Sequence, residues 1–132
     1  MFFTSVVLAE GGNKFSHIDI KVNGQNLKVE YADSEVLRNL GLMNRKTLCA
    51  QCGMLFKLDQ PFRIGMWMKN TYIPLDVAFI RSDGSIVNIE SMKPLDLTIT
   101  YAAEEVLYVL EMNQDWFQSN SIEVGDKVEL EP

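Results

Sequence analysis

Apolar and polar residues alternate along most of this chain, which is the pattern of β-strands that place one face in a core. The alternation runs through residues 17–22, stops at Asn23 and Gly24, and returns over residues 27–31. An Asn-Gly pair between two alternating runs predicts a β-hairpin, because both central residues of a type I′ turn need a positive φ.

A short helix is predicted directly after this hairpin. Asp33 or Ser34 can cap its start, since either side chain can accept a hydrogen bond from a free backbone N–H group of the first turn. Gly41 can close the helix in the left-handed conformation. One face of this helix is apolar and carries Val36, Leu37 and Leu40.

Six further strands are predicted, over residues 54–58, 63–69, 75–81, 86–90, 106–112 and 127–130. The second and third of these are expected to pair through residues 70–74, and their apolar character on both sides predicts that both faces are covered. Residues 91–104 are predicted to be a loop, and residues 114–120 one or two helical turns. This pattern predicts a mainly β fold, either a sandwich or a partly closed barrel of short, mostly antiparallel strands with one or two short helices.

The composition is that of one globular domain. Of the 132 residues, 47% are hydrophobic and 23% are charged, which suits a chain that buries a core. Eighteen acidic residues against 12 basic ones give a net charge of −6, which repels a phosphate backbone, so nucleic-acid binding is not expected. No apolar run has the length of a membrane helix, so no transmembrane segment is expected either.

The N-terminus affects the expected location of the protein. Residues 2–9 are similar to the end of a secretory signal peptide, with Val7 and Ala9 suiting a cleavage site, although a positively charged start is missing and the apolar part is short. The alternative is an ordinary first strand or a frayed tail. We therefore divide the chain into residues 1–14, a tail or signal-peptide remnant, and residues 15–132, a single β-rich domain. A periplasmic or extracytoplasmic location is predicted, with a cytoplasmic one still open.

Cys49 and Cys52 are the only cysteines of the chain, and His17 is its only histidine. A C-x-x-C pair has its most reactive thiol when the first cysteine begins a helix, but here a strand pattern follows directly. A local disulfide in an exported protein, or two inert thiols in a cytoplasmic one, is therefore favoured over redox or metal chemistry. No cofactor and no metal site is predicted.

Polar residues interrupt the apolar strands at a few positions, and these are the candidates for a binding site. Lys69 and Asp76 flank the connection between two predicted strands, so their side chains are expected to approach each other. The functional interpretation is a polar pocket beside Trp67; the structural one is an ion pair at a strand end and a Glu111 carboxylate bound by a backbone group or an arginine. The residues of the candidate pocket are Arg45, Trp67, Lys69, Asn70, Asp76 and Glu111.

Several blocks of the sequence resemble domain-of-unknown-function family 192, over roughly residues 27–130. The blocks are GLMNR (41–45), GMLF (53–56), WMKNTYIPLD (67–76), YVLE (108–111) and the Gly125-Asp126 turn. The resemblance implies a sandwich or barrel-like β-domain with a small helix, and it favours export, but it implies no reaction. Cys49, Cys52 and Asp115 depart from the family pattern.

The interpretation that we favour is a non-catalytic domain of the cell envelope that binds an unknown small molecule or protein partner. The first alternative is a small enzyme, a hydrolase or lyase, that uses Lys69 with Asp76 or Glu111 as acid and base. The second is a thiol or metal role for Cys49 and Cys52. A concave pocket that brings the polar residues together would discriminate between these interpretations.

Overall fold

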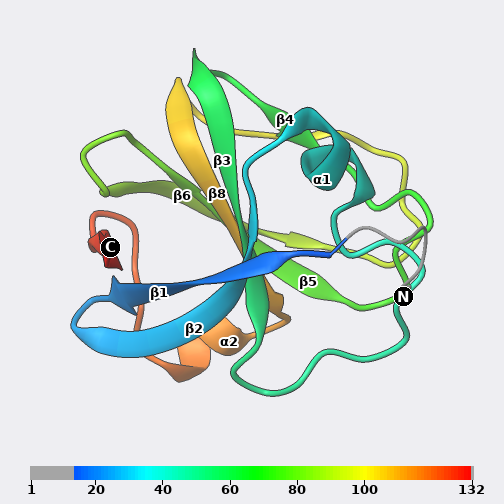
Figure 1. The fold of residues 1–132 in the computed structure, drawn as a ribbon, viewed down its shortest axis with the longest axis horizontal. Helices are drawn as coiled ribbons and strands as arrows, with labels where there is room; N and C mark the ends of the chain where they lie inside the picture. Colours follow the sequence, from blue (N-terminus) through cyan, green and yellow to red (C-terminus); the bar gives the residue numbers. More distant parts are fainter. Residues whose placement is uncertain (1–13, 132) are drawn as a thin grey trace, which may run out of the picture.

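The Asn-Gly hairpin is present in the computed structural model, which describes residues 14–131 (Figure 1). Strands β1 (Ser16–Val22) and β2 (Gln25–Ala32) pair antiparallel, and the residues between them have φ values of 49° at Asn23 and 83° at Gly24. The short helix is confirmed as α1 (Glu35–Leu40), with Ser34 as its N-cap and Gly41 at a φ of 49°. The predicted tail lies, apart from Lys14, outside the described residues.

The fold is mainly β, as predicted, and consists of one curled seven-stranded sheet with a small second sheet. The strand order of the large sheet is β6-β5-β8-β3-β2-β1-β9; β2 and β3 pair in parallel, and the other neighbours are antiparallel. The remaining strands of this sheet are β3 (Gly53–Phe62), β5 (Leu75–Ile80), β6 (Ile86–Met92), β8 (Val106–Asn113) and β9 (Val128–Glu131). The second sheet pairs β4 (Gly65–Met66) with β7 (Thr100–Tyr101).

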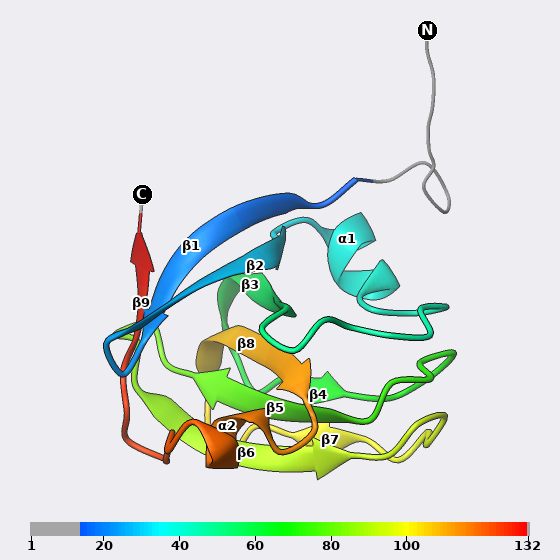
Figure 2. The same cartoon turned by 90° about the horizontal axis from the view of Figure 1, so that it is seen from below.

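The large sheet curls until its two ends meet near β9 (Figure 2). The backbone N–H of Ile86 donates to Asp126, and the N–H of Gly125 donates back to the carbonyl of Ile86, both at 2.9 Å. Val128 likewise donates to the carbonyl of Gly84 at 2.8 Å. The segment that enters β9 therefore bonds to the start of β6, which gives a partly closed barrel, one of the two architectures that the sequence predicts.

Two apolar cores lie on the two faces of the sheet, so the central strands are covered on both sides. Every residue of β5 is buried; Val77 and Phe79 belong to one core, and Ala78 and Ile80 belong to the other. The core that contains Ile80 also receives the side chains of α2 (Trp116–Ser119). The core that contains Phe79 lies on the face that carries α1 and β4, and this face also holds the candidate site.

One predicted strand and its pairing are wrong. Residues 63–69 contribute only the two residues of β4, which pair with β7 and not with β5. The reason is that both edges of β5 are already occupied, by β6 and by β8. Met68 lies beyond the end of β4, and its backbone N–H donates to the carbonyl of Asp96 at 3.0 Å. Its side chain packs in the core that contains Phe79.

The end of another strand also differs from the expectation. The sequence predicts a strand over residues 54–58, but β3 continues through Asp59, Gln60 and Pro61 to Phe62. Its pairing with β8 shifts register between Lys57 and Phe62, so Pro61 lies where the ladder is already interrupted. Within residues 14–131, no helix combines the length and the apolarity that crossing a membrane requires.

Candidate functional site

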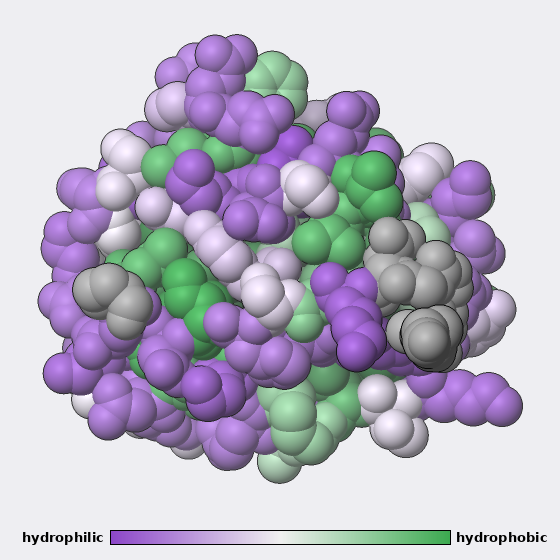
Figure 3. All heavy atoms as spheres, in the orientation of Figure 1, coloured by the Kyte–Doolittle hydropathy of each residue, from purple (hydrophilic) through white to green (hydrophobic). Residues whose placement is uncertain are grey.

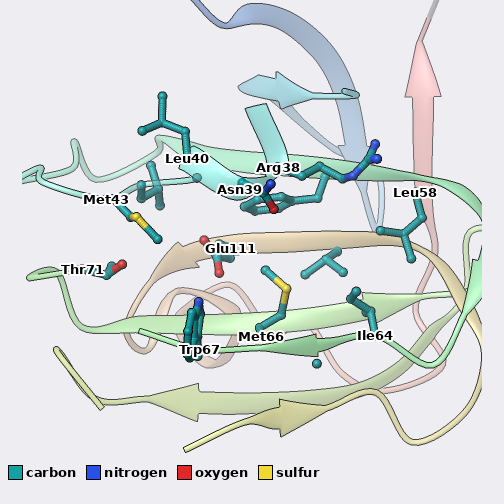
Figure 4. Close-up of a pocket in the computed structure, with 15 residues that line it drawn as sticks. Arg38, Asn39, Leu40, Met43, Leu58, Ile64, Met66, Trp67, Thr71 and Glu111 are labelled. Atoms are coloured by element: carbon teal, nitrogen blue, oxygen red, sulfur yellow. The ribbon is translucent and has the colours of Figure 1, made fainter. Parts of the chain in front are cut away.

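A cleft of about 210 Å³ lies between α1 and β4, above strands β3 and β8 (Figure 4). Most of its wall is apolar, formed by Leu40, Leu42, Met43, Phe56, Leu58, Ile64, Met66, Trp67 and Val109. The polar side chains that line it are Arg38, Asn39, Thr71 and Glu111. On the face of the molecule drawn in Figure 3, hydrophilic residues surround small, separate apolar areas.

Two local features of the sequence hold the cleft open. The positive φ of Gly41 ends α1 and turns the chain, so that Leu42 and Met43 follow the helix along the wall. On the opposite side, β4 packs so closely against β7 and the residue before it that a Cβ atom at Gly65 would collide with Ile99 and Tyr101. The absence of a side chain at Gly65 therefore lets β4 approach β7 and form the second wall.

Glu111 lies in the floor of the cleft and is the unusual feature of the site. Its position on β8 is opposite Met54 of β3 and Val77 of β5, and its side chain points into the space below α1 (Figure 4). The residue is 4% exposed, and none of the hydrogen bonds or ion pairs found within the described part of the chain involves its carboxyl group. Because no fully enclosed side-chain oxygen or nitrogen of the described residues lacks a partner, the carboxyl oxygens of Glu111 are in contact with the open space of the cleft. Burial raises the pKa of this carboxyl group to about 8, so it is largely protonated at neutral pH.

Arg38 also lines the cleft but does not neutralise Glu111. Its guanidinium group donates to the backbone carbonyl of Lys57 at 2.8 Å and contacts the carboxylate of Asp59 at 3.2 Å. Figure 4 shows this group turned away from Glu111. The positive charge of Arg38 is therefore bound to two residues of β3 and not to Glu111.

Trp67 and Thr71 complete the wall on the side of β4. The indole of Trp67 is 44% exposed, and the ammonium group of Lys69 lies 5.5 Å from its ring centroid. Thr71 is 5% exposed, and its hydroxyl group donates to the backbone carbonyl of Lys69 at 2.9 Å. Because this bond uses the hydroxyl hydrogen, the oxygen of Thr71 remains available to the cleft as an acceptor.

The structure brings together two of the six residues of the predicted pocket, Trp67 and Glu111. Arg45 does not line the cleft; it forms a two-pronged ion pair with Glu30, at 2.6 and 2.8 Å, beside a separate and more open hollow. Asn70 is exposed, has a φ of 51°, and accepts a 2.8 Å hydrogen bond from the backbone of Asn44 at its carbonyl. Asn70 therefore shapes a turn, as asparagine often does.

The predicted contact between Lys69 and Asp76 is wrong. Asp76 is 6% exposed, and its carboxylate accepts hydrogen bonds from the hydroxyl of Ser91 at 2.8 Å and from the backbone N–H of Asp115 at 2.9 Å. Lys69 instead lies over Trp67, on a loop that does not pair with β5. Asp115 has a φ of 71°, a left-handed conformation that glycine adopts without strain. The departure from the family pattern at this position therefore lies at a left-handed residue, whose backbone N–H is bound by the Asp76 carboxylate.

Cys49 and Cys52 form a disulfide in the structure, with their Cα atoms 5.0 Å apart. The loop that carries them is fixed to the end of β8, because the side-chain amide of Asn113 donates to the carbonyls of Leu48 at 3.1 Å and of Cys49 at 2.9 Å. Among residues 14–131, no group of three or more His, Cys, Asp or Glu side chains is placed to hold a metal ion. The disulfide is therefore a local clamp on a loop outside the cleft.

Replacing both cysteines by serine should lower the free energy of unfolding by about 2 kcal/mol, because the chain-entropy effect of so short a loop is small. The two residues are only three positions apart in the sequence. Urea unfolding followed by far-ultraviolet circular dichroism would measure the difference. Complete loss of the folded state in the double variant would contradict this expectation and would show that the loop organises the domain.

Sequence reasoning missed most of the wall of the cleft, including Phe56, Met66 and Thr71. All three lie within or next to the sequence blocks that carry the family resemblance, which was the available signal. Alternation could place Glu111 on the same face as Val109, but it could not show that α1 and β4 leave an opening above that face. The cleft depends on contacts between segments that are far apart in the sequence.

The fold and the cleft together define a small, mainly β domain with a partly closed barrel and one buried carboxyl group facing an apolar pocket. The chain belongs to the DUF192 family (domain of unknown function 192), whose family model, described as "Uncharacterized ACR", matches residues 18–130. The resemblance found in the sequence is thus confirmed, and the function of the family is unknown.

Two solved structures are similar over nearly their whole length. One is a protein from Sinorhizobium meliloti 1021 described as a proposed transcription regulator; it is 35% identical, with a TM-score of 0.85, and the match covers 89% of this chain and 96% of that one. The other is a protein of unknown function from Novosphingobium aromaticivorans DSM 12444, 32% identical with a TM-score of 0.80, covering 94% and 91%. The comparison with curated proteins gave no match.

Proposed function

We propose that this protein is a non-catalytic domain of the cell envelope that binds a small molecule in the cleft between α1 and β4. The observation that carries the proposal is the buried carboxyl group of Glu111, which faces an apolar cleft and has no protein partner within the described residues. A buried polar group without a partner lowers the stability of a fold. A ligand that hydrogen-bonds to Glu111 would offset this cost, so ligand binding would explain why a carboxyl group lies at this buried position.

The size of the cleft supports a small ligand. Its volume is about 210 Å³, whereas an engineered apolar cavity of about 150 Å³ in another protein holds a benzene molecule. A single ring with one or two additional atoms therefore fits. The walls supply apolar and aromatic contacts, and a few polar groups supply orientation, which is the usual composition of small-molecule sites.

The geometry gives less support to the enzyme alternative. That interpretation needs Lys69 to act with Asp76 or Glu111, but Lys69 lies over Trp67, and Asp76 is held by Ser91 and Asp115. Among the described residues that line the cleft, the other charged side chain besides Glu111 is Arg38. Arg38 is bound to the carbonyl of Lys57 and to Asp59 on β3. The alternative as stated needs two titratable groups within reach of the same substrate, one as acid and one as base.

Two observations support a location in the cell envelope. Cys49 and Cys52 are joined in a disulfide, and disulfides persist mainly in oxidising compartments. Residues 2–9 are similar to the end of a signal peptide. Thiol alkylation of the protein in intact cells, read by mass spectrometry, tests the location: we expect labelling only after a reductant is added, and labelling without reductant would contradict it.

Ligand binding can be tested with Trp67→Ala and a matched control. We expect a fragment screen by ¹H–¹⁵N NMR to give ligands that shift the amide signals of Thr71 and Glu111. Trp67→Ala should weaken these ligands about tenfold, because the indole forms one wall of the cleft. Tyr72→Ala is the control, since Tyr72 is similarly exposed, 49% against 44%, on the same loop but outside the cleft wall. A screen without any such ligand, or equal effects of both variants, would contradict the proposal.

A further inference from the structure

The hydrogen-bonding character of the cleft indicates which chemical group it would bind. Two buried polar side chains line it, Thr71 and Glu111. Thr71 uses its hydroxyl hydrogen on the carbonyl of Lys69, so only its oxygen lone pairs remain, and an ionised Glu111 can only accept. A ligand group that meets both Thr71 and the ionised form of Glu111 must therefore donate hydrogen bonds.

The charge distribution of the cleft favours a positive ligand over a negative one. The ionised form of Glu111 would repel a carboxylate or a phosphate group placed in the floor, and Arg38 is bound to the carbonyl of Lys57 and to Asp59. The other charged group near the wall, Lys69, lies over the ring of Trp67. The neighbours of Glu111 on β3 and β5 are Met54 and Val77, which are apolar.

The apolar part of the wall is also suited to a cation. Trp67 and Phe56 present aromatic rings, whose faces attract cations, and Met43 and Met66 present polarisable thioether groups. A bare metal ion would find few ligands, because the described residues offer no cluster of three His, Cys, Asp or Glu side chains. An organic cation combines a charge for the floor of the cleft with an apolar body for its walls.

We propose that the cleft binds a small organic cation, a primary ammonium group on an apolar body, whose N–H groups donate to Glu111 and Thr71. This inference rests on the proposed function and adds the chemical class of the ligand. An ammonium group has three donors, enough for both side chains and for a further acceptor such as the amide of Asn39, which also lines the cleft.

A pH dependence follows, because the ammonium group pairs with the ionised form of Glu111. Burial raises the pKa of Glu111 to about 8, so below that pH the binding-competent form is the minor one. Its fraction rises about tenfold for each pH unit, and the apparent affinity rises in proportion. Binding below pH 8 should also release a proton, since Glu111 must ionise while the amine stays protonated.

Three ligands of nearly equal size separate the possible outcomes: benzylamine, benzyl alcohol and benzoate. NMR titration of the full chain at pH 5.5, 6.5 and 7.5 should give an affinity for benzylamine that rises about tenfold per pH unit, so that benzylamine is the tightest of the three ligands at pH 7.5. Benzyl alcohol should bind more weakly and without this pH dependence. Glu111→Gln should weaken benzylamine by about tenfold or more at pH 7.5 and leave benzyl alcohol nearly unchanged.

Glu30→Gln is the matched control, because Glu30 is a partly buried glutamate paired with Arg45 outside the cleft wall. It should leave benzylamine binding unchanged. At pH 7.5, equal or tighter binding of benzyl alcohol or benzoate at the same amide signals would overturn the ammonium assignment while leaving ligand binding in the cleft intact. If no ligand of this set or of the wider fragment screen shifts those signals, both the proposed function and this inference fail.

Discussion

Glu111→Gln should stabilise the folded protein at pH 8, and the gain should grow from pH 4.5 to pH 8 and level off above it. The carboxyl group has a pKa of about 8 in the folded state, raised by burial from 4.5. Below pH 4.5 it is protonated in both the folded and the unfolded chain, so it creates no difference there. Between pH 4.5 and 8 the unfolded chain ionises while the folded chain stays protonated, so the free energy of unfolding falls as pH rises.

The size of this effect follows from the linkage relation. Each pH unit within this window lowers the free energy of unfolding by up to about 1.4 kcal/mol, which accumulates to an upper limit of roughly 5 kcal/mol by pH 8. Glutamine has nearly the same shape and cannot ionise, so the variant lacks this loss. The advantage of Glu111→Gln over the wild type should therefore be small at pH 5.5 and several kcal/mol at pH 8.5.

Urea unfolding at pH 5.5, 6.5, 7.5 and 8.5 would measure the difference. Glu30→Gln provides the control with the opposite sign, because the Glu30 carboxylate is paired with Arg45 and its loss should destabilise the fold by about 1 kcal/mol or less. Stability curves of wild type and Glu111→Gln that run parallel across this pH range would show that Glu111 is not a buried, unpartnered acid. If Glu111→Gln makes the fold more stable, the wild-type carboxyl group lowers stability, which is expected of a residue whose role is to bind a ligand.

The parts of the fold that local chemistry determines could be predicted from the sequence. Asn23 and Gly24 specify the type I′ turn, and Ser34 and Gly41 specify the two ends of α1. Each signal acts through φ values or hydrogen bonds within a few residues, so it does not depend on the rest of the chain. Alternation also placed Glu111 and Val109 on one face of their strand.

The pairing of residues 63–69 could not be predicted in this way. Ile64, Met66 and Met68 follow a two-residue period and therefore resemble one face of a strand, but the edges of β5 are taken by β6 and by β8, which is far along the chain. Strand partners are decided by which long-range contacts form, and periodicity contains no information about them. The contact expected between Lys69 and Asp76 failed for the same reason, and with it the polar composition of the predicted pocket.

Asp76→Ala should be the most damaging substitution among the six candidate residues, because Asp76 holds three segments together. Its carboxylate joins β5 to Ser91 on β6 and to the backbone N–H of Asp115, the residue before α2. Hydrogen bonds to a charged group contribute roughly 1.5–3 kcal/mol each, so we expect a loss of about 3–5 kcal/mol in the free energy of unfolding. Asp76→Asn should lose less, since its amide oxygen can still accept one of the two bonds.

Lys69→Ala is the informative companion to this substitution. Lys69 contacts the exposed ring of Trp67, and a cation–π contact at such a site contributes roughly 0.5–1 kcal/mol, so the variant should remain close to the wild type. Urea unfolding of Asp76→Ala, Lys69→Ala and the double variant completes a thermodynamic cycle. We expect the two effects to add within about 0.5 kcal/mol, as for residues that share no partner. A larger coupling energy would restore the ion pair that the sequence suggested, and would contradict the separate roles assigned here: Asp76 as an anchor of α2, and Lys69 as part of the rim beside the cleft.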